Sequence, residues 1–213
     1  FISTCSNYGL IKNDELADEN FYLNPLSAYA RAKVNIEKYL SSTHKKVDYT
    51  IFRFATAFGI SPRMRFDLTL NQFVLDVMFN KKLEIYDADT WRPYCHVYDF
   101  ARILEKTYSL NTKKIKHEIF NAGFNQNHST KRDLIKLIIK ISGKKNSRVI
   151  FREFAGSDPR NYKVNFNKLN KAINLKPRFN LEEGISQIIE YINNGVFNNY
   201  KKSIKLGNFS INI

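Results

Sequence analysis

A tyrosine and a lysine one helical turn apart are the first side chains in this sequence that could do chemistry together. Tyr29 and Lys33 are four residues apart, a spacing that places both on one face of a helix. A free phenol has a pKa of about 10, and a neighbouring ammonium group favours the phenolate and lowers that pKa. The pair can therefore supply a general base. The alternative is a half-buried tyrosine beside a lysine whose aliphatic stem packs along the surface.

The elements that would position this pair follow the order strand, loop, helix, strand. Residues 27–41 repeat apolar side chains at helical spacing after Pro25, which predicts a helix. Residues 1–4 read like the end of a strand, and aromatic and β-branched residues at 48–55 predict the next strand. Tyr29 and Lys33 would thus lie on a helix between two strands.

The rest of the chain continues this alternation, which predicts an α/β fold with a mostly parallel sheet. We expect further helices at 68–79, 99–110, 131–142, 166–174 and 181–194, and short strands at 83–86, 94–97, 117–121 and 148–152. Thr130 can cap the helix at 131–142 and Gly143 can end it, while Asn180 with Glu183 resembles a capping box and Gly195 ends the last helix. Residues 198–213 lose helical periodicity, so we expect a loose tail there.

Composition narrows the class of protein. The chain has 213 residues, 43% apolar and 25% charged, which is typical of a globular protein with a sizeable core. Its net charge of +14 could serve nucleic-acid binding, but the basic residues are scattered and we expect no nucleic-acid partner. The two cysteines and four histidines show no metal-ligand spacing, so we expect no metal site. The two cysteines, in a chain too large to need a disulfide, indicate a reduced, cytoplasmic setting. No apolar run is long enough to predict a membrane span.

Five ordered stretches carry polar and aromatic residues around the tyrosine and lysine. They read FISTCSNYG (1–9) running on to NPLSAYARAK (24–33), IFRFATAFG (51–59), WRPYCHVYD (91–99), FNAG (120–123), and DPRNY with NFNKL (158–162 and 165–169). In this order they resemble the NAD-dependent epimerase/dehydratase family, the sugar-nucleotide epimerase type of the extended short-chain dehydrogenase/reductases. The resemblance implies a Rossmann dinucleotide-binding domain with a parallel sheet, joined to a smaller mixed α/β substrate domain.

The resemblance also implies roles for the residues of the site. Tyr29 would be the base that removes a sugar hydroxyl proton, Lys33 would hold the nicotinamide ribose and lower the tyrosine pKa, and Thr4 would hydrogen-bond the reacting hydroxyl. Thr4 matches the family's catalytic serine or threonine, four residues before the tyrosine of the Tyr-Gly pair. These three residues and Phe54 would contact the cofactor. The cofactor implied is NAD, and NADP is less favoured.

The substrate implied by the resemblance is a nucleotide-diphosphate sugar. Arg92 matches the family's diphosphate-binding arginine, since a guanidinium can pair with two phosphate oxygens at once. The alternative for Arg92 is a surface ion pair with Asp89 or Asp99. Arg160 is a second candidate for the same anion, with a solvated loop arginine as its alternative. Thr56 takes the place of a substrate-binding asparagine and keeps a hydroxyl without the amide.

One departure from the family limits the reaction. The family's 4,6-dehydratases carry Asp-Glu directly after the catalytic threonine, whereas this chain has Cys5 and Ser6, which disfavours that elimination. Cys5 could be an acid/base thiol, but we expect a small residue packed behind the site. We likewise expect His96 and Asp99 to be structural rather than catalytic.

A further departure concerns the cofactor site. None of the eight glycines forms the Gly-rich first turn of a dinucleotide site, so the sequence predicts a chain without the first half of that domain. We expect residues 1–62 and 93–122 to belong to the Rossmann domain and residues 63–92 and 123–197 to the substrate domain. The leading hypothesis is that this chain is a fragment, the C-terminal part of an NAD-dependent epimerase. The resemblance also implies a homodimer. The alternatives are a reductase or dehydratase of the same superfamily, or a non-catalytic truncated remnant.

Overall fold

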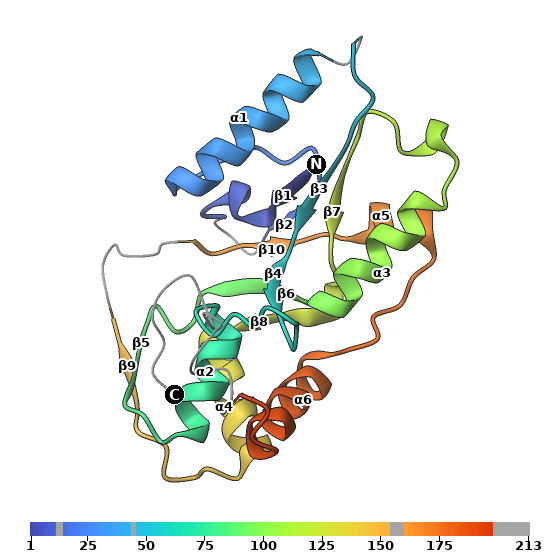
Figure 1. Ribbon diagram of the computed structural model, residues 1–213. Helices are drawn as coiled ribbons and strands as arrows, with labels where there is room; N and C mark the ends of the chain where they lie inside the picture. The colour runs from blue at the N-terminus through green and yellow to red at the C-terminus, as the bar shows by residue number, and fades with distance from the viewer. Residues whose placement is uncertain (12–14, 44–45, 154–159, 198–213) are drawn as a thin grey trace.

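A computed structural model describes residues 1–11, 15–43, 46–153 and 160–197 of the chain (Figure 1). The predicted tail, 198–213, lies outside the described residues. Strands alternate with helices and pair mostly in parallel, so the predicted α/β class is confirmed. None of the described helices combines the length and apolar character needed to cross a membrane.

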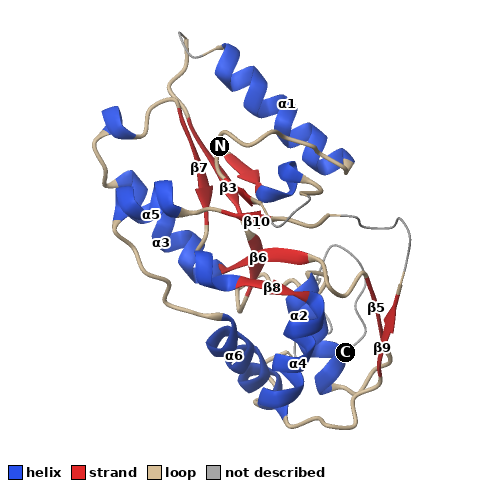
Figure 2. Cartoon of the chain, turned by 180° about the vertical axis from the view of Figure 1, so that it is seen from behind, coloured by secondary structure: helices blue, strands red, loops and turns tan. Residues whose placement is uncertain are grey.

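A three-stranded parallel sheet forms the part of the fold that holds the tyrosine and lysine. Its strands are β1 (Ile2–Thr4), β3 (Thr50–Phe54) and β7 (Glu118–Ala122), in the order β1-β3-β7. The register pairs Thr4 with Phe54 and Phe54 with Ala122, so the carboxyl ends of the three strands meet at one edge. Helix α1 (Ala28–Ser42) lies on one side of the sheet, and α3 (Val97–Tyr108) and α5 (Asn167–Ile173) lie on the other (Figures 1 and 2).

The chain leaves this sheet at Ala55 and enters a second, mixed sheet. Strand β6 (Trp91–His96) runs parallel to β4 (Thr56–Phe58) and antiparallel to β8 (His128–Thr130). Two further parallel pairs join β2 (Leu16–Ala17) to β10 (Lys163–Val164) and β5 (Leu83–Tyr86) to β9 (Val149–Arg152). Because β2, β4, β8 and β10 have only two or three residues, they are too short to show a hydrophobic period, and the sequence did not predict them.

Buried apolar side chains gather in two clusters. One lies under the parallel sheet and includes Phe52, Phe54 and Ile103. The other lies among helices α2 (Thr69–Met78), α4 (Lys131–Ser142) and α6 (Leu181–Asn193), which pack on one another beyond the mixed sheet (Figure 2). Residues 162–175 contribute to the first cluster. The predicted domain boundaries stay a prediction.

Local signals fix the helix ends. The Ser27 hydroxyl accepts the Ala30 N–H at the start of α1, and Thr130 caps α4 in the same way. Asn180 and Glu183 form the predicted capping box, and Gly143 ends α4 in the left-handed conformation with φ +69°. The predicted helices are confirmed to within one or two residues at each end. Helix α3 begins two residues earlier than predicted because the His96 side chain caps it, accepting the Tyr98 N–H.

Candidate active site

A cavity of about 570 Å³ opens where the carboxyl ends of the strands face the mixed sheet. Its wall combines side chains from both apolar clusters, including Phe54 and Tyr94. Of the seven predicted site residues, the six that line it are Thr4, Tyr29, Phe54, Thr56, Arg92 and Arg160. The structure thus brings together residues that lie up to 156 positions apart in the sequence.

The contact between Thr4 and Tyr29 joins a strand end to the first turn of a helix. Thr4 is the last residue of β1, and its hydroxyl oxygen accepts the Ser6 N–H at 3.1 Å, which caps the 3-10 turn at Cys5–Tyr8. Both residues line the cavity, and an interaction between their hydroxyls favours the charged form of Tyr29. The end of β1 and the first turn of α1 therefore place the threonine and the predicted base on the wall of the same cavity.

The electrostatics of Tyr29 differ from the sequence prediction. Partial burial raises the pKa of Tyr29, the hydrogen bond from Thr4 opposes that rise, and the neighbouring Tyr162 adds to it. Lys33 was expected to lower this pKa. Its ammonium instead donates to the Ile2 carbonyl at 2.7 Å and lies 5.7 Å from the centre of the Tyr29 ring. The carbonyl contact and the distance explain why Lys33 does not dominate the pKa of Tyr29.

Phe54 and Thr56 come from the crossover between the two sheets. Phe54 is the last residue of β3, is buried, and packs on Phe100 with ring centres 4.1 Å apart. Thr56 begins β4, opposite Tyr94 of β6. Because Ala55 is hydrogen bonded to the Ala122 carbonyl, the chain turns from one sheet to the other at this point and presents both side chains to the cavity.

Two arginines, Arg92 and Arg160, meet at the cavity wall. Arg92 lies on β6, is 6% exposed, and donates to the backbone carbonyls of Trp91 and Arg160. Its guanidinium lies over the ring of Tyr162, 5.1 Å from the centre. The predicted alternative of a surface ion pair does not describe this buried residue; Asp89 pairs with Arg132 and Asp99 with Arg102.

Several lining residues were not predicted as site residues. Arg65 and Asp67 form an ion pair at 2.6 Å on the loop before α2, and Lys131 lies at the start of α4. Ser6 lies 3.3 Å from the hydroxyl of Tyr162, within hydrogen-bonding distance. The stretch around Tyr162 resembles a family segment and could have indicated that residue. Arg65, Asp67 and Lys131 have no signal in the sequence that would have found them.

The expected structural roles of Cys5, His96 and Asp99 agree with their contacts. The Cys5 thiol is buried, burial raises its pKa, and it lies 3.1 Å from the Arg53 carbonyl. His96 is buried against Gln187, and the Asp99 carboxylate accepts N–H groups of Arg178 and Phe179. Within the described part of the chain, no group of three or more His, Cys, Asp or Glu could hold a metal ion.

His128 connects the mixed sheet to the strand next to Tyr162, and its contacts require a neutral ring. Its Nε2 accepts the Val164 N–H at 2.9 Å while its Nδ1 lies 2.7 Å from the Asn125 carbonyl. Burial lowers the pKa of His128, with Lys163 acting in the same direction and the Asn125 contact opposing it. Protonation of Nε2 would remove the acceptor that holds β10.

We therefore expect the free energy of unfolding to fall as the medium is acidified. With the pKa lowered in the folded state, the unfolded chain binds more protons, so the contribution of His128 is complete above about pH 6.5 and is lost as the pH falls below that value. Thermal unfolding followed between neutral and mildly acidic pH measures the slope. His128→Asn removes one titrating group and should flatten it, while His96, whose pKa burial also lowers, accounts for part of what remains. Equal slopes in the two proteins would contradict this role.

The sequence of this chain is similar to a known family and to curated proteins. The family described as "NAD dependent epimerase/dehydratase family" matches residues 1–123. A UDP-glucuronate 4-epimerase of Thermodesulfobacterium geofontis is 26% identical over 171 residues, covering 78% of this chain and 50% of the relative. The chain spans 50–57% of the length of the curated relatives it matches.

Two solved structures are similar to this chain in fold. The UDP-glucuronic acid 4-epimerase of Bacillus cereus, in complex with UDP-glucuronic acid and NAD, has a TM-score of 0.79 at 26% identity, covering 91% of this chain and 60% of that one. The dTDP-glucose 4,6-dehydratase of Bacillus anthracis, in complex with NAD, has a TM-score of 0.78 at 23% identity, covering 92% of this chain and 62% of that one. The second likeness shows the fold alone.

Proposed function

The chain belongs to the NAD dependent epimerase/dehydratase family, and from this premise we propose that the protein is an NAD-dependent epimerase of a nucleotide-diphosphate sugar. The observation that carries the proposal is that Thr4 and Tyr29 share the wall of one cavity, with Lys33 one helical turn further along α1. This arrangement offers a phenol as base, a hydroxyl to orient it, and a cation beside it.

The residues of the cavity fit part of an NAD site. Ile2, Ser3 and Phe54 give its wall at the strand ends both apolar and hydroxyl groups, and Lys33 could hold a ribose once its ammonium leaves the Ile2 carbonyl. When bound, NAD supplies reversible hydride transfer to and from a sugar carbon. The glycine-rich turn that receives the pyrophosphate is not found among the eight glycines of this chain, so the fit concerns the catalytic end of the cofactor.

Within this site Tyr29 takes the proton from the sugar hydroxyl. Thr4 donates to the phenolate oxygen and stabilises it, because a hydrogen bond to the charged form lowers the cost of charging a partly buried phenol. When the sugar has been reduced again on its other face, Tyr29 returns the proton. The base therefore ends each turnover in the form in which it began.

The cationic side chains of the cavity wall would bind the anionic part of the substrate. Among the lining residues are four cationic side chains and one carboxylate: Arg65, Arg92, Lys131, Arg160 and Asp67. An excess of positive charge in a cavity attracts anions, and guanidinium groups pair well with phosphate oxygens. This wall supports a diphosphate ligand, and the names of the two 4-epimerase relatives favour a UDP-sugar inverted at carbon 4. The homodimer stays a prediction.

Cys5 argues against a 4,6-dehydratase. It occupies the first of two positions where those enzymes carry an acid and a base, yet it is buried with a raised pKa. A thiol in that state transfers no proton at neutral pH. Ser6, at the second position, has no charge to offer.

The test is product analysis with the longest natural form of the protein. Incubated with UDP-glucose, UDP-glucuronate and their 4-epimers, an epimerase interconverts one pair without net oxidation or loss of water, which NMR of the sugar detects directly. A product with a new double bond or a keto group, or net consumption of a reduced nicotinamide, would replace the proposal by a dehydratase or a reductase.

A further inference from the structure

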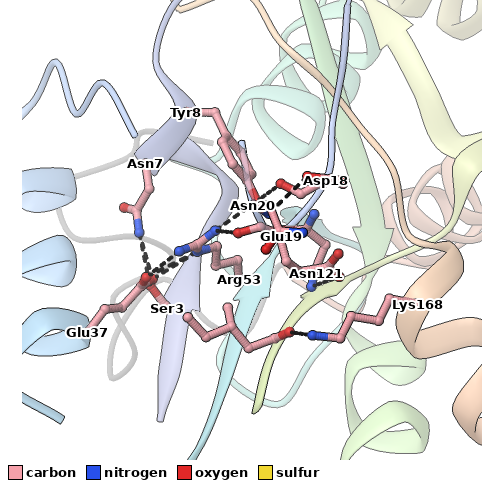
Figure 3. A network of polar contacts seen from close by, with 11 residues as sticks. Ser3, Asn7, Tyr8, Asp18, Glu19, Asn20, Glu37, Arg53, Asn121 and Lys168 are labelled. Carbon is pink, nitrogen blue, oxygen red and sulfur yellow. Dashed lines mark hydrogen bonds and ion pairs between the residues drawn. The ribbon is translucent and has the colours of Figure 1, made fainter. Parts of the chain in front are cut away.

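A buried polar network lies behind the cavity and is not used by the proposed chemistry (Figure 3). Its centre is the carboxylate of Glu37 on α1, which is 3% exposed. Glu37 forms an ion pair with Arg53 of β3, whose Nε and Nη2 donate to the same carboxylate oxygen at 3.1 Å and 2.7 Å. Its other oxygen accepts the Ser3 hydroxyl of β1 and the Asn7 side-chain amide at 2.8 Å. One carboxylate therefore ties α1 to two strands and to the 3-10 turn.

Arg53 extends the network across the sheet to β7. Its Nη1 donates to the hydroxyl of Tyr8 at 3.0 Å and to the Glu19 carbonyl at 3.1 Å. The Tyr8 hydroxyl in turn donates to the Asn121 side chain of β7 at 2.7 Å. The guanidinium is thus held at three of its nitrogens, and its planar fork fixes the position of the carboxylate it binds.

Two strand residues of this network come directly before a residue of the cavity. Ser3 precedes Thr4 on β1, and Arg53 precedes Phe54 on β3. On α1, Glu37 follows Tyr29 by eight residues and Lys33 by four, so the three side chains lie along one side of the helix. Thr4 lies on β1 and Tyr29 on α1, so the distance between their hydroxyls depends on how the helix packs on the strand.

We propose that Glu37 and Arg53 are positioning residues that seat α1 on β1 and β3, keeping the Tyr29 hydroxyl within hydrogen-bonding reach of Thr4. The proposal rests on the proposed function, in which Tyr29 is the base. An apolar contact at this place would let the helix slide, whereas a carboxylate that accepts donors from β1, β3 and the 3-10 turn has one position that satisfies all of them. A shift of about 1 Å in a reacting group can lower a rate by about 100-fold.

The test replaces Glu37 by glutamine, which has the same shape but presents an amide donor toward Ser3, Asn7 and Arg53. We expect kcat to fall by about 10- to 100-fold with little change in KM. A second readout is the titration of Tyr29, observed by NMR in protein labelled at its tyrosine rings and assigned with Tyr29→Phe. Loss of a nearby negative charge alone would move this titration to lower pH, whereas loss of the Thr4 hydrogen bond moves it to higher pH. We expect the shift to higher pH.

Asp99→Asn is the matched control. Asp99 is also a fully buried carboxylate that pairs with an arginine, but it lies on α3 and bonds the backbone at Arg178 and Phe179. It should cost stability without moving the Tyr29 titration. An unmoved or lowered titration in Glu37→Gln, or the same shift in Asp99→Asn, would overturn the proposal. The titration needs no substrate, so a wild-type protein without epimerase activity refutes the proposed function and leaves this test intact.

Discussion

Tyr29→Phe removes one oxygen atom and lowers kcat by about 100- to 10,000-fold, the range that a positioned general base contributes. The fold should be unaffected, because Tyr29 is 56% exposed and phenylalanine keeps the ring. With its pKa raised by partial burial, Tyr29 is mostly protonated at neutral pH, so kcat of the wild type should rise with pH as the phenolate forms. Steady-state kinetics across neutral and alkaline pH, with thermal unfolding of both proteins, measure these effects.

Tyr39→Phe is the control for this variant. Tyr39 lies on the same helix and is 67% exposed, but it does not line the cavity. Its hydroxyl should be dispensable, with kcat and the pH profile as in the wild type. A Tyr29→Phe protein that turns over at the wild-type rate would refute Tyr29 as the base.

Arg53→Met has the largest effect that we expect on stability. Both side chains of the Arg53–Glu37 pair are only 4% exposed, so the variant leaves a buried carboxylate without its counter-charge. Breaking a buried pair in this way costs about 3–5 kcal/mol of unfolding free energy. Urea denaturation measures the change from the shift in midpoint, provided that the slope with denaturant is unchanged.

Arg132→Met provides the comparison. Arg132 also forms a paired contact with a carboxylate, that of Asp89 at 2.7 Å, but the Asp89 side chain is 72% exposed. Water can solvate that carboxylate when its partner is removed, so the midpoint should move little. If the two variants lose the same stability, burial is not what makes the Arg53–Glu37 pair important.

Some elements of this fold could be predicted from the sequence and others could not. The helix around Tyr29 and Lys33 could be predicted because its apolar residues recur at helical spacing and Ser27 can cap it. The short strands β2 and β10 could not, because each is two residues long and exists only where a distant partner pairs with it. The resemblance motifs named Thr4, Phe54 and Arg92 without showing that they share one cavity.

The sequence by itself determined the α/β class, the family and the residue types available for chemistry, because these depend on local periodicity and on short motifs. Only the tertiary structure decided the state of those residues. Three features depend on neighbours far away in the chain: the raised pKa of Tyr29, the hydrogen bond of Lys33 to a backbone carbonyl, and the buried ion pair of Glu37 with Arg53. Solvent exclusion and distance set these interactions, and both arise only when the strands and helices have packed.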